Sequence, residues 1–427
     1  MNGCPAVSGF RRGRPKLAVV PGAQGRSSTL RSRPGANRPA WSPAAGVRVA
    51  ATRTVLVALA LAGAAAGCSG PPPDHTIHVT RGGCGTGWSA PHGGDQTLSI
   101  RNVGTVTMEV ELVDPATHAA YAEVEALGPG TVRPMRVLLG RGTYAFTCFP
   151  DGSDAETGPA VTVADGPARG APAAEPVSEN DYAGPVRSYR TQVTAGLAAL
   201  ASTVAGLRAA IAGGDRGRAQ VAWLTVQTAY SRLGAAYGTF GDAADAIDGL
   251  PSGLPGGVHD KDFTGLRRIE YGLWHAEPLP ALATVAARLD ADVAALRKGF
   301  AAERTDPNDL PLRAHEILEN ALQFELTGDA DQGSGDGLAI IAANLAGTRM
   351  VLSAIAPVIQ PRYPRWAVAS GELDTLARLV AAQDRGGRWT PPAALSRPDR
   401  ERLDGALGQL LEDLAPIAAL GEVRRTP

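Results

Sequence analysis

The sequence has few lysines, cysteines and aromatic residues for a chain of 427 residues. Lysine occurs only three times, so arginine carries almost all the positive charge, a bias that reflects base composition rather than a function. Aromatic residues make up 5% of the chain, and the four cysteines do not have zinc-type spacing. Gly-rich phosphate loops and Ser/His/Asp sets are also absent. These absences argue against nucleotide-binding enzymes, serine hydrolases and zinc-finger proteins.

Acidic residues are missing from residues 1–67, which contain ten lysines and arginines. The rest of the chain has 31 basic against 42 acidic residues, a net charge near −11. An acidic body argues against nucleic-acid binding and is compatible with binding cations. The length allows two or three domains.

The basic N-terminal part ends in an apolar run. Arg48 and Arg53 precede apolar residues 55–66, and this run ends in Ala-Ala-Gly-Cys at Cys68. The run is too short to span a bilayer comfortably, and a charged region before an apolar run and small residues is typical of a secretory signal. The cysteine after small residues looks like a lipobox. We therefore expect residues 1–67 to be an N-terminal extension and lipoprotein signal peptide, with Cys68 lipidated at the outer face of the cytoplasmic membrane. The alternative is an ordinary signal peptide with an incidental cysteine.

About 50 residues precede this signal, although signal peptides normally begin at the N-terminus. They are rich in Arg, Pro, Gly and Ser, which is consistent with disorder. We favour a misassigned start codon, with the true start near Val47 or Val49. Cys4 would then be absent from the protein.

Composition divides the remaining chain into a tether at 68–75, a β domain at 76–165, a linker at 166–178 and a helical domain at 179–422. Alternating apolar residues bounded by glycines predict strands at 77–79, 98–100, 106–113, 143–148 and 161–163. Their number and spacing indicate an antiparallel sandwich of about 90 residues. Helical spacing of apolar residues predicts an all-α bundle, with helices at 182–212, 216–247, 279–302, 311–326, 338–356, 373–382 and 398–419.

Residues 262–275, DFTGLRRIEYGLWH, are the most informative stretch of the helical domain. A loop with Thr264 and Gly265 leads into a helix that places Arg267, Glu270 and Trp274 on one side. A carboxylate on the inward face of a helix is unfavourable unless it is paired or binds a metal. Glu270 is therefore a candidate functional residue.

Residues 310–328 carry a second candidate motif. His315 and Glu319 are four residues apart, and Glu316 and Glu319 are three apart, so they could bind one metal ion from one helix face. The alternative is that Glu316 and Glu319 cap or solvate an amphipathic helix.

These two stretches, FTGLRRIEYGLW and HEILENALQFELTG, resemble the imelysin-like domain of the EfeO and EfeM iron-uptake lipoproteins over roughly residues 182–420. The β domain resembles the cupredoxin-like domain at the N-terminus of EfeO, through a cysteine near the first strand, a Glu-rich turn at 122–130 and Gly-x-Tyr-x-x-x-Cys at 142–148. The resemblance implies a cupredoxin-like β-sandwich followed by an imelysin-like helical bundle.

The chain departs from the family pattern in three places. Arg267 stands where the family has a metal-binding histidine, residues 229–234 offer neither His nor Glu, and residues 329–336 lack a histidine. An arginine cannot bind a metal, but Arg267 could form an ion pair with Glu270. We therefore expect a different acidic site. The candidate metal ligands of the helical domain are Glu270, Asp262, Asp260, His259, His315, Glu316 and Glu319.

The β domain offers its own candidates. Cys148 lies where a blue-copper protein has its cysteine, but residues 149–158 contain no His and no Met, which argues against copper. In an exported protein a Cys84–Cys148 disulfide is favoured over a thiolate metal site. Glu109 and Glu111 are two apart and share a strand face, which a solvated surface would explain equally well. The possible cation ligands here are His78, His92, His118, Glu109, Glu111, Glu123 and Glu125.

The leading hypothesis is a lipid-anchored binding protein that captures Fe³⁺ or Fe²⁺ outside the cytoplasmic membrane. The resemblance implies an iron permease that receives the metal and a haem peroxidase of the same uptake system. One alternative is a structural or interaction lipoprotein that has lost metal binding. The other is a metallopeptidase, but the sequence has no His-Glu-x-x-His, so we do not expect an enzyme.

Overall fold

The computed structural model describes residues 76–88, 91–168 and 170–425. The expected N-terminal extension and signal peptide at 1–67, the lipidated Cys68 and the tether at 68–75 lie outside these residues. The described residues belong to one compact unit. Within it, a β region is followed by a helical region, as the sequence predicts.

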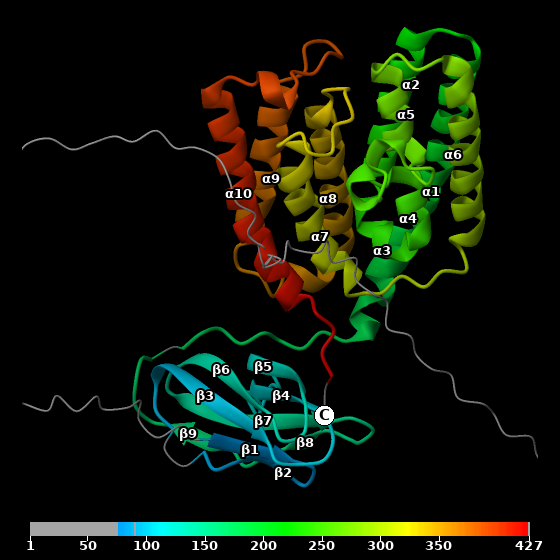
Figure 1. Ribbon diagram of the computed structural model, residues 1–427. Coiled ribbons are helices and arrows are strands. Elements are labelled where there is room, and N and C mark those ends of the chain that lie inside the picture. Colours follow the sequence, from blue (N-terminus) through cyan, green and yellow to red (C-terminus); the bar gives the residue numbers. More distant parts are fainter. Residues whose placement is uncertain (1–75, 89–90, 169, 426–427) are drawn as a thin grey trace, which may run out of the picture. The chain divides into compact units, whose positions relative to one another are not determined.

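The β region contains two sheets (Figure 1). Its strands are β1 (Thr76–Thr80), β2 (Gly83–Thr86), β3 (Gly94–Asn102), β4 (Met108–Val113), β5 (Ala120–Leu127), β6 (Val132–Leu139), β7 (Gly142–Pro150), β8 (Glu156–Thr157) and β9 (Val161–Val163). One sheet has the order β2-β1-β3-β6, and the other has the order β5-β4-β7-β8, with β9 pairing with β7. The expected sheet is fully antiparallel, but β1 and β3 are parallel.

The two sheets enclose one main hydrophobic core. Alternate residues of β1, β3, β4 and β7, such as Ile77, Ile100, Val110 and Phe146, are buried in it. A disulfide between Cys84 in β2 and Cys148 in β7 joins the two sheets, with 5.8 Å between the Cα atoms.

Two strands differ from the expectation. The stretch expected as a Glu-rich turn forms most of β5, and its register places Glu123 opposite Glu111 of β4. Strand β6 contains Pro134, which cannot donate a ladder hydrogen bond. Proline is tolerated there because β6 is the edge strand of its sheet.

The helical region packs around one core. Figure 1 shows α1, α2, α5 and α6 beside one another and α7 to α10 as a neighbouring group, and α8 contacts both α1 and α2. The helices are α1 (Glu179–Ala212), α2 (Arg216–Ser231), α3 (Tyr237–Phe240), α4 (Asp242–Asp248), α5 (Gly265–Trp274), α6 (Leu279–Gly299), α7 (Asp309–Asn320), α8 (Gly337–Ile359), α9 (Trp366–Ala381) and α10 (Arg397–Leu420). By length and composition alone, α1 and α8 could cross a membrane, but a core helix passes the same test, and α8 is mostly buried.

The helix expected over residues 216–247 is broken. It ends at Ser231, and the chain reaches α4 through two short turns and Gly241, which has a φ of 56°. Such a conformation favours glycine. The helix expected over 311–326 also changes, because after Asn320 the chain continues as a π-helical turn, Ala321–Glu325. These two irregularities place the acidic residues Asp248 and Glu325.

Candidate functional site

Helix α5 begins in close contact with the end of α4. Gly265 has a φ of 76°, and a Cβ atom there would lie 2.3 Å from the carbonyl oxygen of Ile247. Only glycine allows this approach. As a result, the first turn of α5 brings Arg267 next to Asp248.

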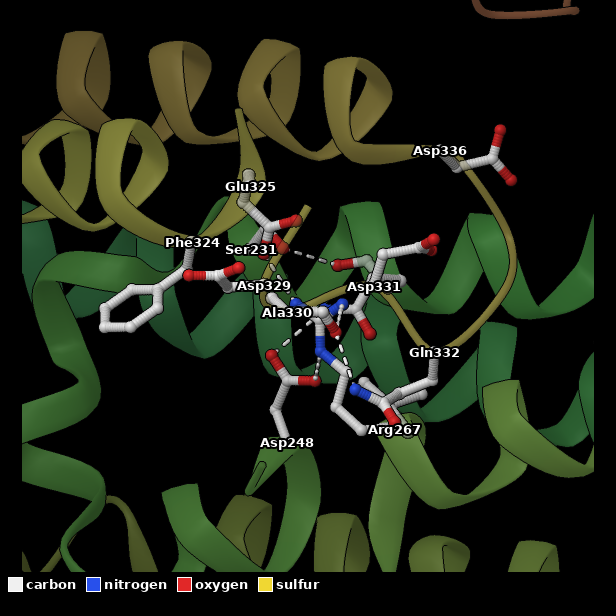
Figure 2. Close-up of polar contacts among 12 residues, drawn as sticks. Ser231, Asp248, Arg267, Phe324, Glu325, Asp329, Ala330, Asp331, Gln332 and Asp336 are labelled. Atoms are coloured by element: carbon white, nitrogen blue, oxygen red, sulfur yellow. Dashed lines mark hydrogen bonds and ion pairs between the residues drawn. The ribbon is translucent and has the colours of Figure 1, made fainter. Parts of the chain in front are cut away.

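Arg267 lies at the centre of a cluster of carboxylates (Figure 2). Its Nε is 3.2 Å from Asp248 Oδ1, its Nη1 is 3.4 Å from Glu270 Oε2 and its Nη2 is 2.6 Å from Glu325 Oε1. The arginine is 3% exposed, and its Nη1 also donates to the carbonyl oxygen of Ala330. The expected Arg267–Glu270 ion pair is confirmed, and two further carboxylates share the same cation.

Glu270 is fully buried, and its second oxygen faces the loop before α8. Oε1 accepts hydrogen bonds from Ser334 Oγ at 2.6 Å and from the backbone nitrogens of Gln332 and Ser334 at 3.0 and 3.3 Å. Asp331 Oδ1 lies 3.0 Å from Ser334 Oγ, whose single proton is directed to either Glu270 or Asp331, and it accepts from the backbone nitrogen of Gly335. Both oxygens of Glu270 are therefore engaged by the protein.

Glu325 reaches the cluster from the π-helical turn at Ala321–Glu325. Such turns shift the residues that follow them relative to a regular α-helix, and they are frequent at functional sites. Glu325 is 8% exposed, and its charge is balanced by Arg267. The charges of this cluster come from α4, α5 and the π-helical turn.

Burial controls the ionisation of this cluster. It raises the pKa of Glu270 to about 8, although Arg267 and the hydrogen bond from Ser334 oppose the shift. Burial also raises the pKa of Asp248 to about 6. For Arg267, burial acts to lower the pKa, but the charges of Asp248, Glu325 and Glu270 outweigh it and raise it. The guanidinium is therefore a permanent internal cation.

This cluster does not fit a metal ion. A metal bound by Asp248, Glu270 and Glu325 would need the space among their oxygens, and the guanidinium of Arg267 occupies it. A guanidinium has no lone pair to offer as a ligand.

The structure does not bring the predicted metal ligands of the helical domain together. Asp260 accepts from the backbone nitrogens of Gly256 and Asp262, which stabilises its own loop. Asp262 pairs with Lys261 at 2.7 Å, and His259 is exposed. None of these groups contacts Glu270 within the described part of the chain.

The second predicted motif lies on the partly exposed face of α7. His315 Nδ1 and Glu319 Oε2 are 3.8 Å apart, and Glu316 pairs with Arg313 at 2.8 Å. Within the residues that the structure describes, no third ligand-type side chain joins either pair, so this geometry is that of a solvated helix face.

The groups of carboxylates that could bind a cation lie mainly in the β region, and one of them includes Glu422 after α10. Among the described residues, groups of three or more ligand-type side chains with donor atoms within 4.8 Å of one another are Glu109, Glu111 and Glu123, and Glu123, Glu125 and Glu422. We call these residues the β4–β5 carboxylate cluster. The three histidines named as candidates in the β region belong to neither group.

Glu111 is the central member of the β4–β5 carboxylate cluster. It lies directly opposite Glu123 on the neighbouring strand, an arrangement that is unfavourable for two like charges. It is 3% exposed, and its Oε1 accepts no hydrogen bond. Burial and the charge of Glu109 raise its pKa to about 7. Burial and the charge of Glu123 also raise the pKa of Glu109.

The disulfide bears on copper chemistry. Cys148 is bonded to Cys84 and is therefore not a free thiolate ligand. The carboxylates that remain are hard oxygen donors, which suit iron, manganese and alkaline-earth cations better than they suit Cu⁺.

Residues 185–385 match the imelysin family. Over 336 residues the chain is 24% identical to "Iron uptake system component EfeO" of Yersinia pseudotuberculosis serotype I (strain IP32953), covering 77% of this chain and 86% of the relative. It is 23% identical over 350 residues to the protein of the same name from Escherichia coli (strain K12), covering 81% and 90%.

The helical region carries this match, and we refer to it below as the imelysin domain. The expected resemblance to EfeO-type iron uptake components is thereby confirmed. The imelysin family carries a peptidase name, whereas these relatives are named as iron uptake components.

Several residues of these clusters were not predicted. Asp248, Glu325, Asp331 and Ser334 surround Arg267 and Glu270 in the imelysin domain, Glu422 belongs to the β4–β5 carboxylate cluster, and Arg424 contacts that cluster. Spacing on a regular helix could not place Glu325, because the π-helical turn changes the spacing. Its position inside the family-like stretch at 310–328 is the one signal that could have drawn attention to it.

Proposed function

We propose that this protein is the iron-binding component of an iron uptake system, anchored by lipid at Cys68 outside the cytoplasmic membrane, and that the β4–β5 carboxylate cluster binds the iron. It would pass iron to a membrane permease, with a haem peroxidase as a further component of the system. The names of the relatives support the system, and the acidic body of the chain supports cation binding. The β region would correspond to a cupredoxin-like domain.

The state of Glu111 is the observation that carries the proposal. A buried carboxylate normally has partners for its oxygens, because loss of hydration is unfavourable. The Oε1 atom of Glu111 has no hydrogen bond, and a carboxylate oxygen of Glu111 lies within 4.8 Å of oxygens from Glu109 and Glu123. A cation of high charge would satisfy all three, and ferric and ferrous iron both accept carboxylate oxygens.

Binding rather than catalysis is favoured by the imelysin domain itself. A metallopeptidase needs a metal with an open position and a general base. Arg267 fills the centre of the carboxylates that would hold such a metal. The same observation supports a second candidate, in which the imelysin domain has only a structural or interaction role.

Isothermal titration of the full chain with Fe²⁺ under anaerobic conditions, and with Fe³⁺ supplied as its citrate complex, tests the proposal. We expect Glu111→Gln to weaken binding at least about tenfold, which corresponds to about 1.4 kcal/mol. Glu270→Gln is the matched control, since it removes one buried carboxylate from the imelysin domain, and it should leave binding unchanged. If the wild type binds no iron, the interaction role is correct. If Glu270→Gln abolishes binding and Glu111→Gln does not, the site is in the imelysin domain.

A further inference from the structure

The segment that follows α10 contacts the β4–β5 carboxylate cluster. After Gly421, the backbone nitrogen of Val423 donates to Asn308 Oδ1 at 2.7 Å, and that of Arg424 donates to the carbonyl oxygen of Val177 at 3.0 Å. These bonds hold the backbone of residues 421–425, which we call the C-terminal segment. The side chains of Arg424 and Arg425 extend from it to residues of the β region.

Arg424 makes its closest ion pair with Glu123. Its Nε and Nη2 donate to the two oxygens of Glu123, both at 3.1 Å, which is a bidentate arrangement. Nε is also 3.9 Å from Glu111 Oε1, and Nη2 is 3.5 Å from Glu422 Oε2. The Arg424 side chain is 7% exposed, and the charged groups that face the cluster are Glu109, Glu111, Glu123, Glu125, Glu422, Arg424 and Arg425.

Arg425 contacts the β region differently. Its Nη1 donates to the carbonyl oxygen of Phe149 at 3.2 Å, and its guanidinium lies over the ring of Phe149 at 5.1 Å. Among the described residues it forms no ion pair with the carboxylates. Two adjacent arginines therefore carry the same charge, but only Arg424 is bonded to the carboxylates.

We propose that Arg424 is the exchangeable counter-ion of the β4–β5 carboxylate cluster, which a bound metal ion displaces from Glu123 and Glu111. This inference rests on the proposed function, because it assigns a regulatory group to the same site. A metal ion held by Glu111 and Glu123 needs the oxygens that Arg424 contacts, so the two cations compete. The competition lowers the affinity of the site for the metal ion and favours release of the bound ion. A protein that passes its metal to a partner requires such release.

The placement of Arg424 suits such an exchange. It lies beyond the last helix, and besides the carboxylates its guanidinium contacts the end of α10, where Nη1 donates to the carbonyl oxygen of Ala419 at 2.9 Å. Moving the guanidinium away from the carboxylates therefore breaks no backbone–backbone hydrogen bond of a helix or a sheet. The backbone bonds to Asn308 and Val177 do not involve the carboxylates, and they can persist when the side chain moves. In the metal-bound protein we therefore expect a more exposed Arg424.

Titration of the full chain with Fe²⁺ under anaerobic conditions, comparing Arg424→Gln with Arg425→Gln, tests the proposal. Removing the competing cation should tighten binding at least about tenfold, whereas the control should change it less than about threefold. Arg424→Lys keeps the charge but loses the bidentate geometry, and its affinity should fall between those of the wild type and Arg424→Gln. Arg424→Lys also serves as a control: if Arg424→Gln lost binding while Arg424→Lys kept it, the loss would come from the missing charge and not from misfolding.

Trypsin provides an independent readout, because it cleaves after exposed arginines. Mass spectrometry should show that Fe²⁺ accelerates cleavage after Arg424 in the wild type and does not do so in a Glu111→Gln/Glu123→Gln variant. Wild-type binding with no tightening in Arg424→Gln and no acceleration of cleavage would overturn the exchange and leave the proposed function standing. Absence of binding in the wild type and in Arg424→Gln alike would overturn both.

Discussion

An arginine lies among three carboxylates in two regions of this protein, and the chain holds the two arginines differently. Arg267 is in the first turn of α5 and contacts Asp248, Glu270 and Glu325 in the imelysin domain. Arg424 follows the last helix and contacts Glu111, Glu123 and Glu422. Both side chains are less than 10% exposed.

The difference lies in how each cation is fixed. Both Nη atoms of Arg267 donate hydrogen bonds, its Nε lies 3.2 Å from Asp248, and its backbone belongs to the mostly buried helix α5, so its side chain has three carboxylate partners inside the imelysin domain. Arg424 has one close carboxylate partner, and its other two are at 3.5 and 3.9 Å. The same charge pattern is therefore structural in the first region and exchangeable in the second.

Removing Arg267 should have the largest effect on stability. Arg267→Met leaves three carboxylates without their cation. Breaking a buried ion pair in this way lowers the free energy of unfolding by about 3–5 kcal/mol. Urea unfolding followed by far-ultraviolet circular dichroism measures the loss. Arg268→Met is the matched control, since Arg268 makes a partly exposed ion pair with Glu277, and it should cost less than about 1 kcal/mol. Equal losses in the two variants would contradict a structural role for Arg267.

Removing the Cys84–Cys148 disulfide should lower the stability of the β region, which Arg424 contacts, and leave that of the imelysin domain unchanged. Cys148 pairs with Val110 of β4, between Glu109 and Glu111, so the disulfide stabilises the strand beside the carboxylates. Replacing Cys84 and Cys148 by alanine should cost about 2–5 kcal/mol. Hydrogen exchange with mass spectrometry should show faster exchange in β4 and β7 and unchanged exchange in α5 and α8. Faster exchange in α5 and α8 as well would contradict an effect confined to the β region.

The pH dependence of stability should identify Glu270 as a group buried mainly in its neutral form. Burial raises its pKa from the ordinary value of 4.5 to about 8, so between these values the folded state binds more protons than the unfolded chain. Stability contributed by this group is complete below about pH 4.5 and is lost as the pH rises through about 8.

Glu270→Gln should remove this loss, because glutamine stays neutral. Relative to the wild type, the variant should gain up to about 1.4 kcal/mol per pH unit over this range. Urea unfolding of both proteins at a series of pH values measures the difference. If the free energy of unfolding depended on pH in the same way in both, the neutral state of buried Glu270 would be contradicted.

The smallest effect should come from the exposed motif on α7. His315→Gln removes a pair with Glu319 that is 3.8 Å long and partly exposed, and such pairs contribute less than about 1 kcal/mol. Neither the unfolding free energy nor iron binding should change measurably. A clear loss of iron binding would place the metal site on α7 and would contradict the assignment to the β region.

The sequence predicted those features that depend on local pattern. The order of a β region and a helical region follows from the change of hydrophobic period, and the Arg267–Glu270 pair follows from a spacing of three residues within one helix. The grouping of Glu109 and Glu111 on one strand face follows from a period of two. Each of these three predictions uses only residues that are close together in the sequence.

The remaining partners could not be predicted, because they depend on interruptions of regular structure and on long-range contacts. Asp248 reaches Arg267 through the break near Gly241, and Glu325 reaches it through a π-helical turn. Arg424 and Glu123 are 301 residues apart in the sequence. Helical spacing holds only within an unbroken helix, so it cannot locate these contacts.

The most direct test of the account is to locate the iron. Crystals of the full chain soaked with iron, and measured at the iron absorption edge, give the position of the metal by anomalous scattering. The account predicts a peak between Glu111 and Glu123, with Arg424 displaced from both. A peak beside Glu270 and Glu325, or at His315, with none at the β4–β5 carboxylate cluster, would contradict it.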